Sequence, residues 1–129
     1  MATINPRHRQ LILQTMVSMA SADGDIDAGE TATIRRAYAD ETSEDISADE
    51  VTEAVQSYRA GSGVLTSALS NANADMDQAT KESLLRASYM VLLADGRIAA
   101  RERKKLHNFA DALKISEIHL SVILEDVSR

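Results

Sequence analysis

The sequence predicts an all-α domain of about seven helices that pack as a compact bundle. Its 129 residues are 44% hydrophobic but only 3% aromatic, with a single proline, and this composition favours helices over strands. Apolar residues recur at helical spacing along the chain, and we find no convincing strand. A chain of this length forms one hydrophobic core, so we expect a single domain over residues 1–129.

Helix-start signals divide this pattern into segments. Asn5 before Pro6 is typical of an N-cap and a first helical position. Asp27 to Glu30 and Ser47 to Glu50 have the spacing of capping boxes, in which each end residue's side chain bonds the other's backbone. With breaks at glycine-rich and asparagine-rich positions, the expected helices are residues 6–22, a segment from Asp27 through Tyr38, one from Ser47 to Gly61-Ser62-Gly63, a short helix around 64–69, a long helix from about 75–77 to Ala94, residues 98–113, and a last helix from Ser116 through Val127.

An internal repeat links two of these helix junctions. The segment Ala22-Asp23-Gly24-Asp25-Ile26-Asp27-Ala28-Gly29-Glu30 recurs 72 positions later as Ala94-Asp95-Gly96-Arg97-Ile98-Ala99-Ala100-Arg101-Glu102. Ala, Asp, Gly, Ile and Glu agree between the copies, and the apolar flanks agree in character. The repeat, about residues 11–39 and 83–111, predicts two related helical hairpins, each with an Ala-Asp-Gly corner.

The repeat separates the corner acids into two groups. Asp25 and Asp27 are replaced by an arginine and an alanine in the second copy, so a function added to the first corner is expected at these two residues. The other acids are common to both copies and are expected mainly to hold the corners, by accepting backbone N–H bonds. They are Asp23, Glu30, Asp95 and Glu102.

The acids of the first corner also form a candidate metal site. An EF-hand loop needs glycine at position 6 and glutamate at position 12, and registers starting at Asp23 or Asp25 supply neither. Two interpretations stand side by side: a site for Ca²⁺ or another divalent cation, which would offset the repulsion between the carboxylates, and a set of solvated capping acids. The candidate ligands are Asp23, Asp25, Asp27 and Glu30, with a backbone carbonyl; in the second copy, Asp95 and Glu102 are expected to be structural.

Charge and composition bear on the class of function. The net charge of −6 and the few aromatic residues argue against nucleic-acid binding through phosphates or base stacking. No apolar run is long enough to cross a bilayer, and the absence of cysteine fits the cytoplasm. We find no catalytic constellation and expect no enzyme.

Three further features have structural interpretations. The histidines His8, His107 and His119 lack ligand spacing and are expected to be surface or half-buried helix residues. The acidic run from Asp40 to Asp45 is expected to be a loop. A basic edge could dock an acidic partner or form a solvated helix face; it consists of Arg101, Arg103, Lys104 and Lys105.

The doubled pattern A-D-G-x-I-x-x-x-E, each time followed by an amphipathic helix, resembles the tellurite-resistance TerB-like family over about Leu11 to Val127. The resemblance implies an all-helical fold with pseudo-twofold halves, no known catalytic activity, and a cytoplasmic role in stress or toxic-oxyanion resistance. It also implies metal binding through the acidic motif and partners that are often membrane-bound; related domains occur in membrane-anchored J-domain co-chaperones.

Two functions are therefore expected from the sequence. The first is a non-enzymatic stress-response module, a monomer or weak dimer, that binds a divalent cation at the first corner and acts through protein partners. The second is a metal-free interaction domain that uses its acidic and basic faces.

Overall fold

Seven α-helices form the part of the chain that the computed structural model describes, which is residues 4–20, 26–60, 64–94 and 100–128. No strand occurs in these ranges, so the all-α prediction is confirmed. The helices are α1 (Pro6–Ala20), α2 (Ala28–Thr42), α3 (Ala48–Ala60), α4 (Leu65–Ala72), α5 (Gln78–Ala94), α6 (Ala100–Ala112) and α7 (Glu117–Ser128).

Side-chain caps begin most of these helices where the sequence predicts them. The N–H of Arg7 donates to Asn5 Oδ1 at 2.8 Å, and the N–H of His119 donates to the Ser116 hydroxyl at 3.1 Å. At the start of α3, the Glu50 N–H donates to Ser47 Oγ at 3.1 Å and the Ser47 N–H to Glu50 Oε1 at 3.3 Å. The second capping box is thus confirmed. Each cap satisfies a backbone donor that has no partner within its helix.

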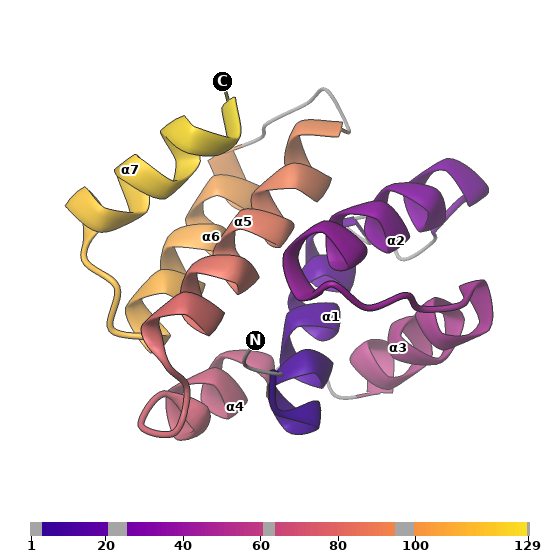
Figure 1. Cartoon of the computed structure of the whole chain (residues 1–129), viewed down its shortest axis with the longest axis horizontal. Helices are drawn as coiled ribbons and strands as arrows, with labels where there is room; N and C mark the ends of the chain where they lie inside the picture. The colour runs from indigo at the N-terminus through magenta and orange to yellow at the C-terminus, as the bar shows by residue number, and fades with distance from the viewer. Residues whose placement is uncertain (1–3, 21–25, 61–63, 95–99, 129) are drawn as a thin grey trace.

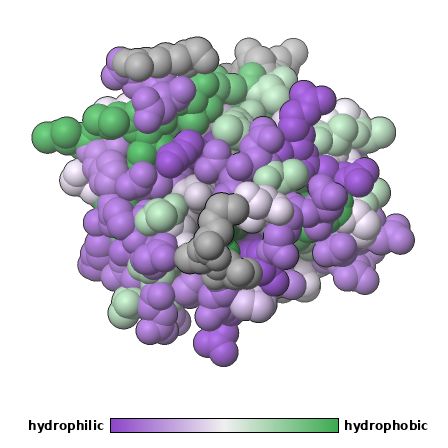
Figure 2. Space-filling model, in the orientation of Figure 1, coloured by the Kyte–Doolittle hydropathy of each residue, from purple (hydrophilic) through white to green (hydrophobic). Residues whose placement is uncertain are grey.

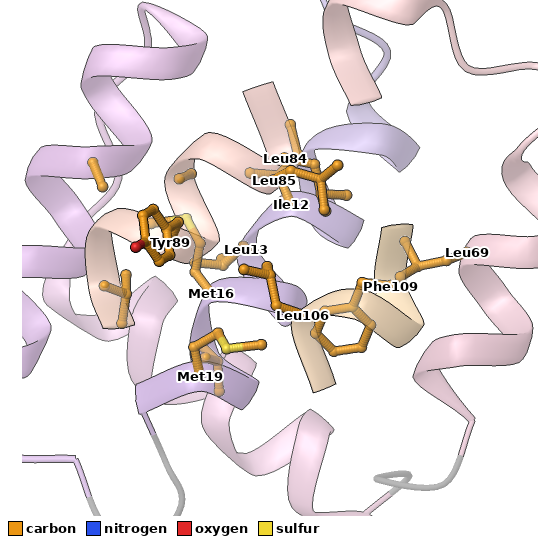
Figure 3. Close-up of a cluster of buried hydrophobic side chains, with 14 of the residues drawn as sticks. Ile12, Leu13, Met16, Met19, Leu69, Leu84, Leu85, Tyr89, Leu106 and Phe109 are labelled. Atoms are coloured by element: carbon orange, nitrogen blue, oxygen red, sulfur yellow. The ribbon is translucent and has the colours of Figure 1, made fainter. Parts of the chain in front are cut away.

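The hydrophobic core lies mainly between α1 and α5. α1 packs against α5 and is also contacted by α2, α3 and α4, while α5 also contacts α2, α6 and α7. In Figure 1, α5 runs through the middle of the molecule, with α6 and α7 on one side and α1 and α2 on the other. Figure 3 shows the side chains that meet there, including Ile12, Leu13 and Met16 from α1 and Leu84 and Leu85 from α5.

α2 is longer than its predicted segment and contains part of the acidic run. It continues to Thr42, so the expectation of a loop from Asp40 is wrong for the first residues of the run. Tyr38 is buried on the inner side of the helix, and the Glu41 side chain is only 13% exposed. Ser43 follows the helix as its C-cap; its φ of 62° is left-handed, and its N–H donates to the Ala39 carbonyl.

The helical pairs α1–α2 and α5–α6 are in contact, as the two predicted hairpins require. Their Ala-Asp-Gly corners fall in residues 21–25 and 95–99, which lie outside the described residues. The left-handed glycines expected at those corners therefore stay a prediction. Among the described residues, no helix has the length and apolar character that crossing a membrane requires.

Candidate functional site

The start of α2 carries the described half of the predicted metal site. Asp27 is the N-cap, and its Oδ1 accepts the Glu30 N–H at 2.7 Å. Glu30 Oε1 in turn accepts the Asp27 N–H at 3.2 Å. The predicted capping box is therefore confirmed, and it holds the two carboxylates side by side at the positive end of the helix dipole.

A pocket of about 350 Å³ opens beside this capping box, and we call it the corner pocket. Asp27 is exposed and Glu30 is half-buried, and both border it. Three helix ends meet here: the end of α1, the start of α2 and the end of α5. The residues that line the pocket are Ala20, Asp27, Gly29, Glu30, Thr33, Val91 and Ala94.

The backbone carbonyls of the α2 start are already engaged. The Asp27 carbonyl accepts the N–H and the hydroxyl of Thr31, both at 3.0 Å. The Gly29 carbonyl accepts the Thr33 hydroxyl at 3.1 Å. A carbonyl oxygen has two lone pairs, so a cation held at this part of the corner would be bound by carboxylate oxygens.

The other predicted ligands have different outcomes. Asp23, Asp25 and Asp95 lie outside the described residues, so their side chains stay predictions. Glu102 is half-buried in the first turn of α6, in the position that Glu30 has in α2. Among the residues that the structure describes, no three His, Asp or Glu side chains converge on a point that could hold a metal ion.

The basic edge of α6 divides into an outer and an inner part. Arg101, Arg103 and Lys104 are exposed. Lys105 instead reaches across to α1, where its Nζ donates to the Ser18 carbonyl at 2.9 Å. Burial lowers the pKa of Lys105, against an opposing effect of the nearby Glu102 charge. Three of the four basic residues thus form the expected solvated face, while the fourth ties α6 to the last turn of α1.

A second hollow, of about 520 Å³, lies at the opposite ends of the same three helices, and sequence reasoning missed it. It is bordered by the start of α1, the end of α2 and the start of α5. We call it the acidic groove because four of its lining residues are carboxylates. Its lining is Ile4, Asn5, His8, Glu41, Thr42, Ser43, Glu44, Asp75, Asp77, Ala79, Thr80 and Ser83.

Two carboxylates of the acidic groove are paired with arginines. Glu44 Oε2 lies 2.6 Å from Arg9 Nη1, and Glu41 Oε1 lies 3.6 Å from Arg86 Nε. Burial raises the pKa of Glu41, while Arg86 and a hydrogen bond with Ser83 partly oppose that rise. Arg9 therefore compensates Glu44, whereas Arg86 also lies 3.5 Å from Glu82 outside the groove and compensates Glu41 only in part.

A third carboxylate caps the central helix. Asp77 Oδ1 accepts the Thr80 N–H at 2.8 Å. Hydrogen bonding by the Thr80 hydroxyl and then by its backbone N–H lowers the pKa of Asp77, and the nearby His8 adds to this. Asp77 is therefore a persistently ionised group at the edge of the groove.

The histidines differ in burial. His107 and His119 are half-buried, as expected, and His119 Nε2 lies 3.1 Å from Glu82 Oε2. His8 is only 7% exposed, so the expectation that it lies at the surface or half-buried is wrong. The sequence does indicate this burial, because His8 lies one turn before the fully buried Ile12 and so continues the core-facing stripe.

The outer face of α7 carries exposed apolar residues. Ile118 is 81% exposed and Val122 is 54% exposed, one helical turn apart. Figure 2 shows the resulting hydrophobic surface over α7 at the upper left of the molecule.

Comparisons of the chain with protein-family models, with curated proteins and with solved structures found no match.

Proposed function

We propose that this protein is a non-enzymatic stress-response module of the cytoplasm, similar to the TerB-like family, that binds a divalent cation at the first corner and acts through protein partners. The observation that carries the proposal is that Asp27 and Glu30 jointly border the corner pocket. The capping box engages Oδ1 of Asp27 and Oε1 of Glu30. An ionised carboxylate has about four lone-pair sites on its two oxygens, so the Asp27 carboxylate can cap α2 and bind a cation at the same time.

The proposed cation chemistry follows from the ligand type. Ca²⁺ takes six to eight oxygen ligands in flexible geometry, and Mg²⁺ takes fewer protein oxygens and keeps its waters. Asp23 and Asp25 lie four and two positions before the N-cap Asp27 and are the proposed further ligands. A cation shared by these acids would offset their mutual repulsion.

The test is a titration of Ca²⁺, Mg²⁺ and Zn²⁺ into the wild type and into an Asp25→Asn/Asp27→Asn variant, by calorimetry and amide NMR. Asparagine caps a helix about as well as aspartate, so the variant keeps the α2 start while losing two charges. We expect saturable heat and shifts around residues 23–30 in the wild type, and at least tenfold weaker binding in the variant. An Asp45→Asn/Asp49→Asn variant has the same charge change at exposed positions outside the corner, and it should bind like the wild type.

Two results would contradict cation binding at the corner. One is the absence of saturable binding in the wild type. The other is equal weakening in both double variants, since that would trace the effect to net charge and not to the corner.

A metal-free interaction domain is the second candidate, and the exposed apolar face of α7 favours it. Ile118 and Val122 are exposed one turn apart, and exposed apolar patches on soluble proteins often mark interaction sites. An Ile118→Ser/Val122→Ser variant tests this alternative beside the corner variant. If partner binding is lost in the α7 variant and kept in the corner variant at every cation concentration, the metal-free function is the correct one.

A further inference from the structure

The acidic groove is built from three helix ends that are far apart in the sequence. His8 comes from the first turn of α1, Glu41 from the last turn of α2, and Asp77 is the residue before α5. The groove lies at the start of α5, and the corner pocket lies at its end. With a rise of 1.5 Å per residue, the two sites are about 20 Å apart along this helix.

His8 is the feature of the groove that points to a ligand. Its side chain is more than nine-tenths buried and borders the groove, and it forms no hydrogen bond with any residue in the described ranges. Buried polar side chains in folded proteins nearly always have a hydrogen-bond partner. A water molecule or a ligand in the groove can supply the partner of this imidazole.

The charges of the groove indicate the kind of ligand. Arg9 pairs with Glu44, and Arg86 is shared between Glu41 and Glu82, whereas Asp75 and Asp77 form no ion pair with a described residue. The positive ends of the α1 and α5 dipoles also border the groove and are capped by Asn5 and Asp77. The excess negative charge therefore comes from the unpaired carboxylates and from the C-terminal end of α2, whose last turn contains no basic residue. The groove is therefore complementary to a positive charge.

The hydrogen-bonding groups of the lining indicate which class of cation suits the groove. The hydroxyls of Thr42 and Ser83 border the groove together with His8 and the carboxylates, and all of these groups can accept hydrogen bonds. A primary ammonium has three donors and no acceptor, which suits such a lining. A bare metal ion suits it less, because no three metal-ligating side chains converge within the described part of the chain.

We propose that the acidic groove binds a small organic cation with primary ammonium groups, of the diamine or polyamine class. One ammonium group donates to His8 and Asp77, and the rest of the molecule lies along the groove toward Asp75. The volume of about 520 Å³ is within the range of small-molecule sites and accommodates a chain of this length.

The experiment is a titration of spermidine, by calorimetry and amide NMR, at about 0.15 M salt, where contacts between distant surface charges are screened. Two variants probe the groove. Asp77→Asn keeps the cap on α5 and removes the charge, and His8→Phe keeps an apolar ring and removes the nitrogen atoms. We expect Asp77→Asn to weaken binding about tenfold or more and His8→Phe about fivefold, as for the loss of a charged and a weaker hydrogen bond.

A matched control and a fold check complete the design. Asp111→Asn removes one charge from an exposed position on α6 that does not border the groove, and it should leave spermidine affinity within about twofold of the wild type. Far-UV circular dichroism and thermal unfolding verify that each variant folds. If His8→Phe does not fold, Asp77→Asn and Ser83→Ala still test the groove.

Several outcomes would overturn the proposal. They are the absence of saturable spermidine binding, equal weakening by Asp111→Asn and Asp77→Asn, and displacement of spermidine by equimolar Mg²⁺, which would assign the groove to an inorganic cation. The Asp25→Asn/Asp27→Asn variant should bind spermidine like the wild type. The groove proposal and the corner proposal therefore succeed or fail independently.

Discussion

The capping box of α2 makes a quantitative prediction about the stability of the first corner. Asp27 accepts the Glu30 N–H at 2.7 Å, and Glu30 accepts the Asp27 N–H at 3.2 Å. Replacing an N-cap aspartate with alanine costs about 1 kcal/mol, within a range of roughly 0.5–2. Because Asp27 is exposed, water partly replaces the lost bond, and we expect Asp27→Ala to lower the free energy of unfolding by about 1 kcal/mol.

The two bonds of the box should differ in value. The longer bond is the one that the Glu30 side chain accepts, so loss of this bond in Glu30→Ala should lower the free energy of unfolding by less, about 0.5 kcal/mol. The two residues bond each other reciprocally, so the double variant should cost less than the sum of the single variants. Asp27→Asn should cost only a few tenths of a kcal/mol, because the amide oxygen still accepts the Glu30 N–H.

Urea unfolding in a metal-free buffer, followed by far-UV circular dichroism, measures these differences. The reasoning is refuted if Asp27→Asn destabilises the protein as much as Asp27→Ala, because the charge and not the acceptor would then carry the stability. It is also refuted if the Asp27 and Glu30 variants are strictly additive, since the two bonds would then be independent. The Asp27→Asn result also shows whether this substitution, which is part of the variant used in the cation titration, leaves the start of α2 intact.

Three further predictions concern the core, the α6–α1 contact and the pH dependence of stability. Leu85 is fully buried, so Leu85→Ala should cost about 3 kcal/mol in urea unfolding, whereas loss of under 1 kcal/mol would contradict a packed core at this position. Lys105→Met keeps the volume and loses the bond to the Ser18 carbonyl, but it also removes the buried charge whose desolvation lowers the Lys105 pKa. Thermal unfolding should therefore detect a loss of less than about 1 kcal/mol, the value of a hydrogen bond alone. Burial raises the pKa of Glu41 above its ordinary 4.5, so the folded protein binds more protons between that value and the raised one. The stability of the wild type relative to Glu41→Gln should therefore rise as the pH falls through this window, and a parallel pH dependence in the two proteins would refute the assignment.

The elements that sequence reasoning predicted correctly are those with local causes. The caps at Asn5, Asp27, Ser47 and Ser116 depend on residues within three positions of each helix start, and such short-range rules can be applied to a sequence directly. The predicted basic edge included Lys105 only because of its charge. Its position one turn before the buried Phe109 indicates that the side chain of Lys105 points inward.

The acidic groove could not have been predicted in the same way. It combines residues 4–8, 41–44 and 75–83, and their proximity depends on how α1, α2 and α5 pack. The internal repeat did indicate which helices form hairpins, but it contains no information on how the far ends of these helices meet. The run of acids from Asp40 was visible, yet its division into a helix end with the half-buried Glu41 and an exposed Glu44 depends on the contact with α5.

The two proposed sites lie at opposite ends of the same helical layer, and this arrangement determines how they should interact. α1, α2 and α5 border both the corner pocket and the acidic groove, so a ligand at either site that binds only the folded chain should stabilise the whole layer by mass action. Coupling between the sites would need an element with two alternative packings. The side chains between them, including Ile12, Met16 and Leu85, are fully buried in one continuous core. We therefore expect the stabilisation by Ca²⁺ and by spermidine to be additive in thermal unfolding, each ligand leaving the affinity of the other unchanged within about twofold. A larger mutual effect would show that the three helices shift as a unit when either end is occupied.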